Sequence, residues 1–335
     1  MASLRRPLLS LGRLRHRPCT QHSIRFYSFH PSPDPAGAPA SSSTTPTAIA
    51  DIPRPKATLH TLRQLYKKQI PIATITAHDF PSALAADQAG TDLILIGDSL
   101  AMVALGYTST NQVTMEDMIH HSKAVVRGTK SAYVVADLPF GTYEASPEDA
   151  VRNAAKLIRE GGVEAVKLEG GKEMAVTIER LTRVGIPVMG HIGLLPQRQA
   201  ALGGFRVQGK TAASAAQLLE DAVALEKAGC FAIVLEAMPA EIAEIITKRI
   251  TVPTIGIGAG SACSGQVLVQ LDMLGAFERF VPKFVKQYES IGVKTRQAIG
   301  KYVEEVKARS FPAVQHTYPI KPEELEKFKV KVGSD

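Results

Sequence analysis

Ionisable side chains follow five successive apolar runs of this chain, each at or just after the point where the run ends. They are Asp98, Asp137, Glu169, His191 and Glu236. A single acid in such a position most often caps the next helix or lies at the surface. Five in succession are harder to explain in that way, and they predict a site where charged side chains converge.

Three of these residues, Asp98, Asp137 and Glu169, are carboxylates on neighbouring runs. A set of oxygen ligands suits a hard cation such as Mg²⁺ better than it suits zinc. Mg²⁺ that chelates the carboxylate and keto oxygen of a 2-oxo acid acidifies the adjacent carbon and stabilises the enolate. We therefore predict a Mg²⁺ site at these three residues, with proton abstraction from a 2-oxo acid as its chemistry.

Two further residue types complete this chemistry. Lys167 lies two residues before Glu169, so strand alternation directs both side chains to one face, where the lysine can neutralise a developing oxyanion. Glu236, from a run across the site, is the predicted general base because it is not used as a ligand. His191 is the alternative base, and a role in orienting the substrate or in the core is the competing interpretation of this histidine.

The elements that must position these residues are eight short apolar runs separated by amphipathic stretches, a pattern typical of repeated βα units. Several runs are continuously apolar, as expected for parallel strands buried on both faces. We predict a (β/α)8 TIM barrel, in which the active site lies at the carboxyl ends of the strands. The runs are Pro71–Ala77, Leu93–Gly97, Tyr133–Leu138, Ala165–Glu169, Pro187–Ile192, Ala232–Glu236, Pro253–Gly258 and Val267–Met273.

An open, doubly wound sheet is the alternative architecture. Only residues 259–266 separate the last two runs, which is too few for a full crossover helix, so a barrel must close with a turn there.

The helices have recognisable ends. Ser146 followed by Pro147 and two acids predicts a helix that closes at Gly161, and Thr114 predicts one that closes at Gly128. Helices are also expected at about 211–228 and at 59–67. The latter precedes the first strand and is expected to cover the barrel floor.

Two glycine-rich segments have open interpretations. Residues 255–260, IGIGAG, resemble a phosphate-binding loop at the seventh strand, or they allow close packing or the approach of a flat cofactor. Residues 203–210, GGFRVQGK, are interpreted as a mobile basic loop that closes over an anionic substrate, or as a solvated connection.

The charge of the chain is concentrated at its amino end. The net charge is +7, but residues 1–50 hold six arginines, no lysine and one acid, which leaves the remainder at about +2. A near-neutral body predicts no nucleic-acid partner, and no apolar stretch is long enough to span a membrane, so no membrane partner is expected. Cys230 and Cys263 are too far apart in sequence for a CxxC-type site and are expected to be free thiols.

The first thirty residues contain no acid and are rich in arginine, serine and leucine, which predicts a mitochondrial transit peptide and a location in the matrix; a basic tail without a targeting role is the alternative. Residues 31–50 are rich in proline, alanine, serine and threonine and are interpreted as a disordered linker. We expect residues 1–50 to be presequence and linker, 51–317 to form the barrel domain, and 318–335 to be a tail.

Nine segments together resemble the ketopantoate hydroxymethyltransferase family, in that family's order and spacing over about residues 55–317. They are TAHD (76–79), IGDSLAM (96–102), ADLPFGTY (136–143), VKLEGG (166–171), GHIGLLPQ (190–197), GGFRVQGK (203–210), VLEAMP (234–239), IGIGAG (255–260) and PKF (282–284).

The resemblance implies a barrel of the phosphoenolpyruvate/pyruvate-like group, assembled as a homo-oligomer that is often a decamer. It implies addition of a one-carbon unit from 5,10-methylenetetrahydrofolate to 3-methyl-2-oxobutanoate, giving 2-dehydropantoate in pantothenate synthesis. The enolate left by removal of the C3 proton would attack the methylene carbon of the folate, in its opened iminium form, and hydrolysis would release the product.

By the same resemblance, individual residues take roles. Asp98, Asp137 and Glu169 match the family's magnesium neighbourhood, Ser99, Asp137 and Lys167 match its 2-oxo acid contacts, and Glu236 matches its general base. In the first segment the family usually has tyrosine where this chain has His78. That difference leaves the local hydrogen bonding open.

Two alternatives to this function are retained. One is another Mg²⁺-dependent lyase or aldolase of the same barrel group that acts on a 2-oxo acid, which dependence on folate would distinguish. The other is a catalytically inactive scaffold paralogue, which usually lacks ligands or the base, whereas this chain has all of them.

Overall fold

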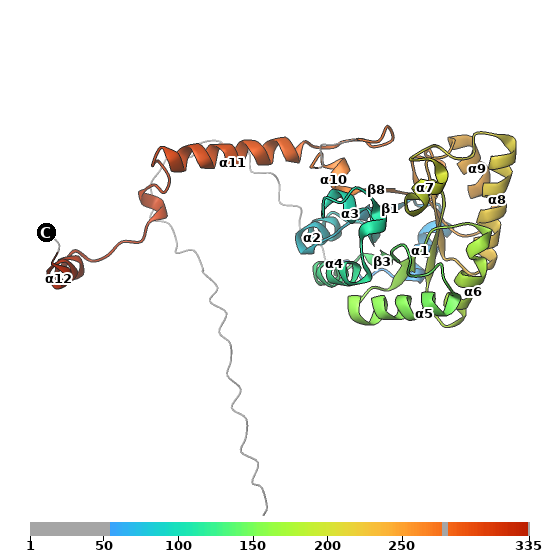
Figure 1. The fold of residues 1–335 in the computed structure, drawn as a ribbon, viewed down its shortest axis with the longest axis horizontal. Coiled ribbons are helices and arrows are strands. Elements are labelled where there is room, and N and C mark those ends of the chain that lie inside the picture. Colours follow the sequence, from blue (N-terminus) through green and yellow to red (C-terminus); the bar gives the residue numbers. More distant parts are fainter. Residues whose placement is uncertain (1–53, 277–280, 334–335) are drawn as a thin grey trace, which may run out of the picture. The chain divides into compact units, whose positions relative to one another are not determined.

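Eight parallel strands form a closed barrel in the computed structural model, which describes residues 54–276 and 281–333 (Figure 1). The predicted presequence and linker, residues 1–50, lie outside the described residues. The strands are β1 (Ile72–Thr76), β2 (Leu93–Ile96), β3 (Tyr133–Asp137), β4 (Ala165–Lys167), β5 (Val188–Gly193), β6 (Ala232–Glu236), β7 (Thr254–Ile257) and β8 (Gly265–Leu268).

Helices connect most of these strands. Those before and within the barrel are α1 (Leu59–Lys67), α2 (Phe80–Gln88), α3 (Leu100–Val103), α4 (Met115–Gly128), α5 (Pro147–Lys156), α6 (Ala175–Arg183), α7 (Gln199–Leu202), α8 (Ala212–Lys227), α9 (Ala240–Arg249) and α10 (Gln270–Met273). Two more, α11 (Ile291–Lys307) and α12 (Pro322–Val332), follow.

Closure of the barrel settles the choice between the two architectures. β1 pairs in parallel with β2 and also with β8, with Ile72 opposite Gly265, so the sheet has no edge. The link between β7 and β8 consists of turns, as the short spacing predicted. The doubly wound alternative is wrong.

The predicted last strand differs most from the structure. β8 begins at Gly265 and ends at Leu268, and residues 270–273, which belong to the predicted run, form α10 instead. A short, continuously apolar run does not distinguish a strand from a buried helical turn. The difference matters because it places Asp272 on a helix at the barrel mouth.

Two hydrophobic clusters hold the barrel together. One packs the outer helices against the strands. The other includes alternate strand residues such as Ile72, Leu93 and Val135 together with Leu62 of α1, which is 3% exposed. The helix predicted to cover the barrel floor is confirmed, and it packs through Leu62.

The predicted helix starts are confirmed with their capping bonds. The side chains of Thr114, Ser146 and Thr211 each accept a hydrogen bond from a backbone N–H in the first turn of the helix that follows. Because these bonds satisfy donors that the helix cannot, each helix begins at a defined residue and the loop before it is fixed.

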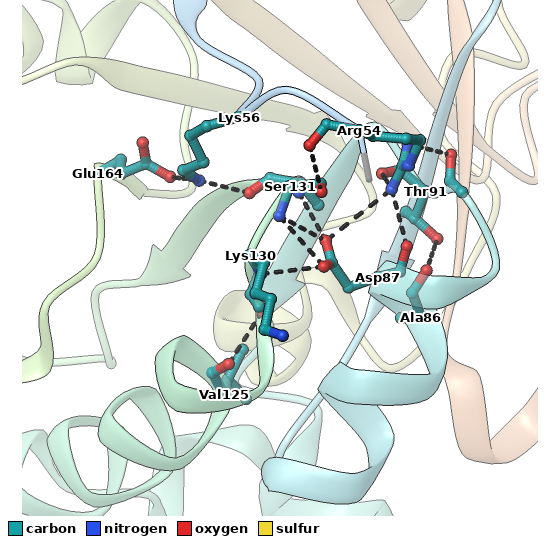
Figure 2. Close-up of polar contacts among 12 residues, drawn as sticks. Arg54, Lys56, Ala86, Asp87, Thr91, Val125, Lys130, Ser131 and Glu164 are labelled. Carbon is teal, nitrogen blue, oxygen red and sulfur yellow. Dashed lines mark hydrogen bonds and ion pairs between the residues drawn. The ribbon is translucent and has the colours of Figure 1, made fainter. Parts of the chain in front are cut away.

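A polar network lies below the barrel, at the amino ends of β2 to β4 (Figure 2). The carboxylate of Asp87, at the end of α2, accepts hydrogen bonds from the backbone N–H groups of Lys130, Ser131 and Ala132. Arg54 donates to the carbonyl oxygens of Asp87, Gly90 and Thr91. Lys56 joins the carbonyl of Ala132 to Glu164.

We expect Asp87→Ala to lower the free energy of unfolding by about 3–5 kcal/mol, because each buried donor left without a partner costs about 1–3 kcal/mol. Equilibrium denaturant unfolding measures the change. Asp87→Asn, which keeps one acceptor oxygen, should give an intermediate loss. Glu220→Ala, which removes an exposed ion pair, should change stability little. A loss below about 1 kcal/mol for Asp87→Ala would contradict this role.

The carboxyl-terminal helices expose their apolar side chains. α11 buries no residue, and Ile299 and Tyr302 are among its exposed apolar residues. α12 lies within the segment interpreted as a tail, residues 318–335, so part of that segment is helical. Within the described ranges, every helix is too short or too polar to cross a membrane.

Candidate active site

All seven residues predicted for the site line one cavity of about 420 Å³ at the carboxyl ends of the strands. Each comes from the carboxyl-terminal part of a strand or from the three residues that follow it, so the register of the barrel brings them together. They are Asp98 and Ser99 after β2, Asp137 at the end of β3, Lys167 and Glu169 at and after the end of β4, His191 in β5 and Glu236 at the end of β6.

The charged residues of this cavity are deeply buried. Asp98, Asp137, Lys167, Glu169 and His191 are all 4% exposed or less. Charges removed from water in this way require partners of opposite sign. The expectation that Lys167 and Glu169 share one face agrees with their burial in the same cavity, although β4 itself ends at Lys167.

An ion pair joins the carboxyl end of β3 to that of β4. The Lys167 ammonium lies 3.1 Å from Asp137 Oδ1, and the backbone N–H of Asp98 donates to Asp137 Oδ2 at 3.0 Å. Burial, together with Asp137 and Glu169 nearby, holds the pKa of Asp98 well above its usual range. Burial lowers the pKa of Lys167, but the surrounding carboxylates outweigh it and raise that pKa above its usual range. The lysine is therefore a permanent cation.

His191 lies between two carboxylates. Its Nε2 is 3.1 Å from Glu236 and its Nδ1 is 3.6 Å from Glu169. Burial and Lys167 lower the pKa of His191, but hydrogen bonding to Glu169 and Glu236 raises it to about 9. The two ring nitrogens therefore face charged groups on both sides, and Nε2 lies where it can orient the Glu236 carboxylate.

Gly193 allows Glu236 to take this position. Its φ is +99°, and a Cβ added there would fall 2.2 Å from the carbonyl oxygen of Glu236. Ala237, directly after Glu236, has a φ of +45°, a conformation that costs energy for a residue with a side chain. The backbone on either side of Glu236 is thus fixed by close contacts.

Two residues of the site were not predicted. The side-chain amide of Gln197 donates to Asp98 Oδ2 at 2.8 Å, and its backbone N–H donates to Glu169 at 3.0 Å. The hydroxyl of Tyr143 donates to the side-chain oxygen of Gln197. Both lie in segments that carried the family resemblance, but nothing in residue type or spacing distinguished a buried Gln or Tyr from a packing residue.

Some features of the site favour a divalent cation and one does not. Asp137 Oδ1, apart from its ion pair, and Glu169 Oε1 are buried and receive no hydrogen bond. Four acids, Asp98, Asp137, Glu169 and Glu236, gather with Lys167 and His191 in this cavity. Within residues 54–276 and 281–333, however, no three His, Cys, Asp or Glu side chains form a ready three-ligand centre.

The two glycine-rich segments have different places in the structure. Gly258 lies under the ring of Phe284, where an added Cβ would be 2.6 Å from Cδ1, so this glycine serves close packing. In the second segment, Phe205, Arg206 and Val207 line the cavity. His78 does not line it; its carbonyl oxygen contacts His121 Nδ1 and burial lowers its pKa.

Comparison with known proteins covers nearly the whole described chain. A sequence model of the family described as ketopantoate hydroxymethyltransferase matches residues 56–314. The 3-methyl-2-oxobutanoate hydroxymethyltransferase of Emericella nidulans is 57% identical over 314 residues, which cover 93% of this chain and 89% of that protein. The protein of the same name from Carboxydothermus hydrogenoformans is 53% identical over 272 residues, 81% of this chain and 99% of its own.

Solved structures with the same fold are more distant in sequence. A phosphonopyruvate hydrolase superposes with a TM-score of 0.53 at 14% identity, covering 82% of this chain and 95% of its own. 2,3-Dimethylmalate lyase, a member of the PEP mutase/isocitrate lyase superfamily, superposes with a TM-score of 0.50 at 16% identity, covering 83% and 96%. These likenesses confirm the predicted barrel fold, and the family match shows that the chain belongs to the ketopantoate hydroxymethyltransferase family.

Proposed function

We propose that this enzyme transfers a hydroxymethyl group from 5,10-methylenetetrahydrofolate to 3-methyl-2-oxobutanoate and forms 2-dehydropantoate for pantothenate and coenzyme A synthesis. Membership of the family supports the reaction. The observation that carries the mechanism is the position of Glu236, whose carboxylate is held 3.1 Å from His191 in the cavity that also contains the buried carboxylates.

Asp98 and Asp137 are the residues proposed to hold Mg²⁺, with Glu169 acting through water. Mg²⁺ commonly uses one or two carboxylates and keeps several waters, so the lack of a three-residue centre is compatible with this proposal. The grouping of carboxylates around the single ammonium of Lys167 supports a cation site there. When bound, the ion would polarise the keto oxygen of the 2-oxo acid and so acidify C3.

Ser99 and Lys167 are proposed to bind the 2-oxo acid. The ammonium of Lys167 is fixed by Asp137 and is 3.3 Å from His191 Nδ1, which leaves it little freedom to move. Preorganised charge of this kind stabilises a developing oxyanion without reorganisation during the reaction. Ser99 lies at the start of α3, and its side chain forms no capping bond, so the hydroxyl is available to the substrate.

Glu236 is proposed to remove the C3 proton. Both ring nitrogens of His191 already face charged neighbours, Glu236 on one side and Glu169 with Lys167 on the other, which favours Glu236 over the histidine as the base. His191 then orients the carboxylate. The carbanion carbon of the substrate bonds to the methylene carbon of the folate, and water supplies the hydroxyl oxygen as the bonds from that carbon to the folate nitrogens break.

The experiment that tests this function is an assay for 2-dehydropantoate with both substrates present. We expect product only with Mg²⁺ and methylenetetrahydrofolate together, and removal of the metal with EDTA should abolish it reversibly. Turnover of 3-methyl-2-oxobutanoate or another 2-oxo acid without folate would favour the lyase or aldolase alternative. Absence of both activities in folded protein would favour the inactive paralogue.

A homo-oligomer, such as a decamer, is proposed as the assembly. The apolar side chains of α11, among them Ile299 and Tyr302, support association because they are exposed in the described part of one chain. Light scattering coupled to size exclusion measures the mass, and a monomer at micromolar concentration would contradict the proposal.

A mitochondrial matrix location is proposed from the sequence of residues 1–30. Import of the full chain into isolated mitochondria, with protection from added protease and shortening of the polypeptide, tests it. An unprotected full-length chain would contradict it.

A further inference from the structure

Asp272 is a buried acid of the cavity that the mechanism does not use. It lies on α10, lines the same cavity as the catalytic residues and is 8% exposed. Burial raises its pKa to about 6. Over residues 54–276 and 281–333, its side chain has no hydrogen bond or ion pair, although Gln287 donates to its backbone carbonyl. A largely buried acid without a protein partner that faces a cavity is a site for a ligand that supplies donors.

Apolar residues contribute much of the lining of the cavity that contains Asp272. They include Ile257, Val267, Val269 and Phe284, with Lys283 beside Phe284, and the Phe284 ring packs on Gly258. A mostly apolar pocket with a few polar groups that fix orientation is the usual form of a small-molecule site.

Asp272 lies outside the strands that carry the residues proposed to bind Mg²⁺ and the 2-oxo acid. Those residues follow β2, β3 and β4, whereas α10 follows β8, which β1 separates from β2 in the closed barrel. Cavities of about 300–1,000 Å³ hold ligands of drug size, so the 420 Å³ here exceeds the need of a five-carbon acid. The part near β7 and β8 is therefore free for a second, larger substrate.

We propose that the Asp272 carboxylate recognises the pterin ring of the reduced folate, by accepting hydrogen bonds from its N3–H and 2-amino groups. These two donors lie side by side on the pyrimidine edge, and the two oxygens of a carboxylate can accept them together, as they accept a guanidinium. The inference rests on the proposed function, because it assigns the second substrate of that reaction to a half of the same cavity.

The test measures the affinity for (6S)-tetrahydrofolate, which has no methylene group to transfer, by calorimetry with Mg²⁺ and 3-methyl-2-oxobutanoate present. A second ligand, 2-desamino-2-methyl-tetrahydrofolate, lacks one donor. We expect Asp272→Asn to weaken tetrahydrofolate binding by about tenfold or more, as for loss of hydrogen bonds to a charged group. The unmodified protein should prefer tetrahydrofolate to the analogue by about tenfold, whereas the variant should hardly distinguish them.

Two further readouts separate recognition from a structural role. Asp272→Asn should leave the folate-independent exchange of the C3 proton of 3-methyl-2-oxobutanoate unchanged, and it should not lower the melting temperature, because it removes a buried charge. Glu289→Gln, which changes an exposed acid beyond the same helix, is the control and should alter none of these quantities.

The outcomes distinguish the two proposals. Normal C3-proton exchange with unchanged tetrahydrofolate affinity in Asp272→Asn overturns this inference alone, as does equal binding of the two folates by the unmodified protein. Loss of C3-proton exchange in the variant also overturns it, since the carboxylate would then serve the 2-oxo acid. Absence of that exchange in the unmodified protein overturns the proposed function, and this inference with it.

Discussion

Replacing Glu236 by glutamine is expected to lower the rate of C3-proton exchange in 3-methyl-2-oxobutanoate by about 10²–10⁴-fold, which is the usual contribution of a general base. Glutamine has nearly the shape of glutamate but cannot take up a proton at neutral pH. It can still accept a hydrogen bond from His191, so the backbone conformation at Gly193 and Ala237 should persist. Proton NMR in deuterium oxide follows the exchange directly, with Mg²⁺ and no folate.

The same variant should still bind Mg²⁺ and the 2-oxo acid, because neither Asp98 nor Asp137 is altered. Glu241→Gln, five residues further on the exposed side of α9, is the matched control and should exchange the proton normally. If Glu236→Gln exchanges the proton at the original rate, Glu236 is not the base, and His191 becomes the first candidate to replace it.

Asp137→Asn is expected to have the second large effect, through loss of the divalent cation. Asp137 interacts with both Lys167 and the backbone of Asp98, and its Oδ1 receives no hydrogen bond. Removing its charge should weaken Mg²⁺ binding by at least about tenfold and lower product formation by at least about the 10²-fold typical of lost electrostatic stabilisation. Electron paramagnetic resonance of Mn²⁺, a spectroscopic substitute for Mg²⁺, measures binding without reference to activity.

Glu148→Gln removes an exposed carboxylate in the first turn of α5, the helix that follows β3. It should leave the Mn²⁺ affinity unchanged. Unaltered Mn²⁺ affinity in Asp137→Asn would place the metal elsewhere in the cavity. In that case a bound metal ion would not explain why Glu169 Oε1, and Asp137 Oδ1 apart from its ion pair, are buried without a hydrogen bond.

Much of the fold was predictable because its signals are local. Strands buried on both faces are continuously apolar, and capping residues such as Thr114 and Ser146 mark helix starts by bonds to their own first turns. The charged residues of the site were predictable for a related reason. A single acid after an apolar strand most often caps a helix, but ionisable residues at the ends of five successive strands indicate a shared site.

Other parts of the site depend on contacts between residues that are distant in sequence. Gln197 becomes part of the site only because β5 places it beside Asp98, which is 99 positions earlier in the chain. Asp272 was hidden within an apolar run that was interpreted as a strand and is in fact split between β8 and α10. The three predicted metal ligands were chosen because they lie at neighbouring strand ends. Strand order does not determine the direction of each side chain, and the Glu169 carboxylate contacts His191 and the backbone N–H of Gln197.

The network at the amino ends of β2 to β4 ties residues before the first helix to the barrel. Its basic members, Arg54 and Lys56, bind the loops that enter β2 and β3 (Figure 2). A protease cut before residue 54 retains every described contact of that network, whereas a cut after Lys56 removes both cations. The boundary at which proteolysis starts to weaken the amino ends of these strands is therefore expected at residues 54–56.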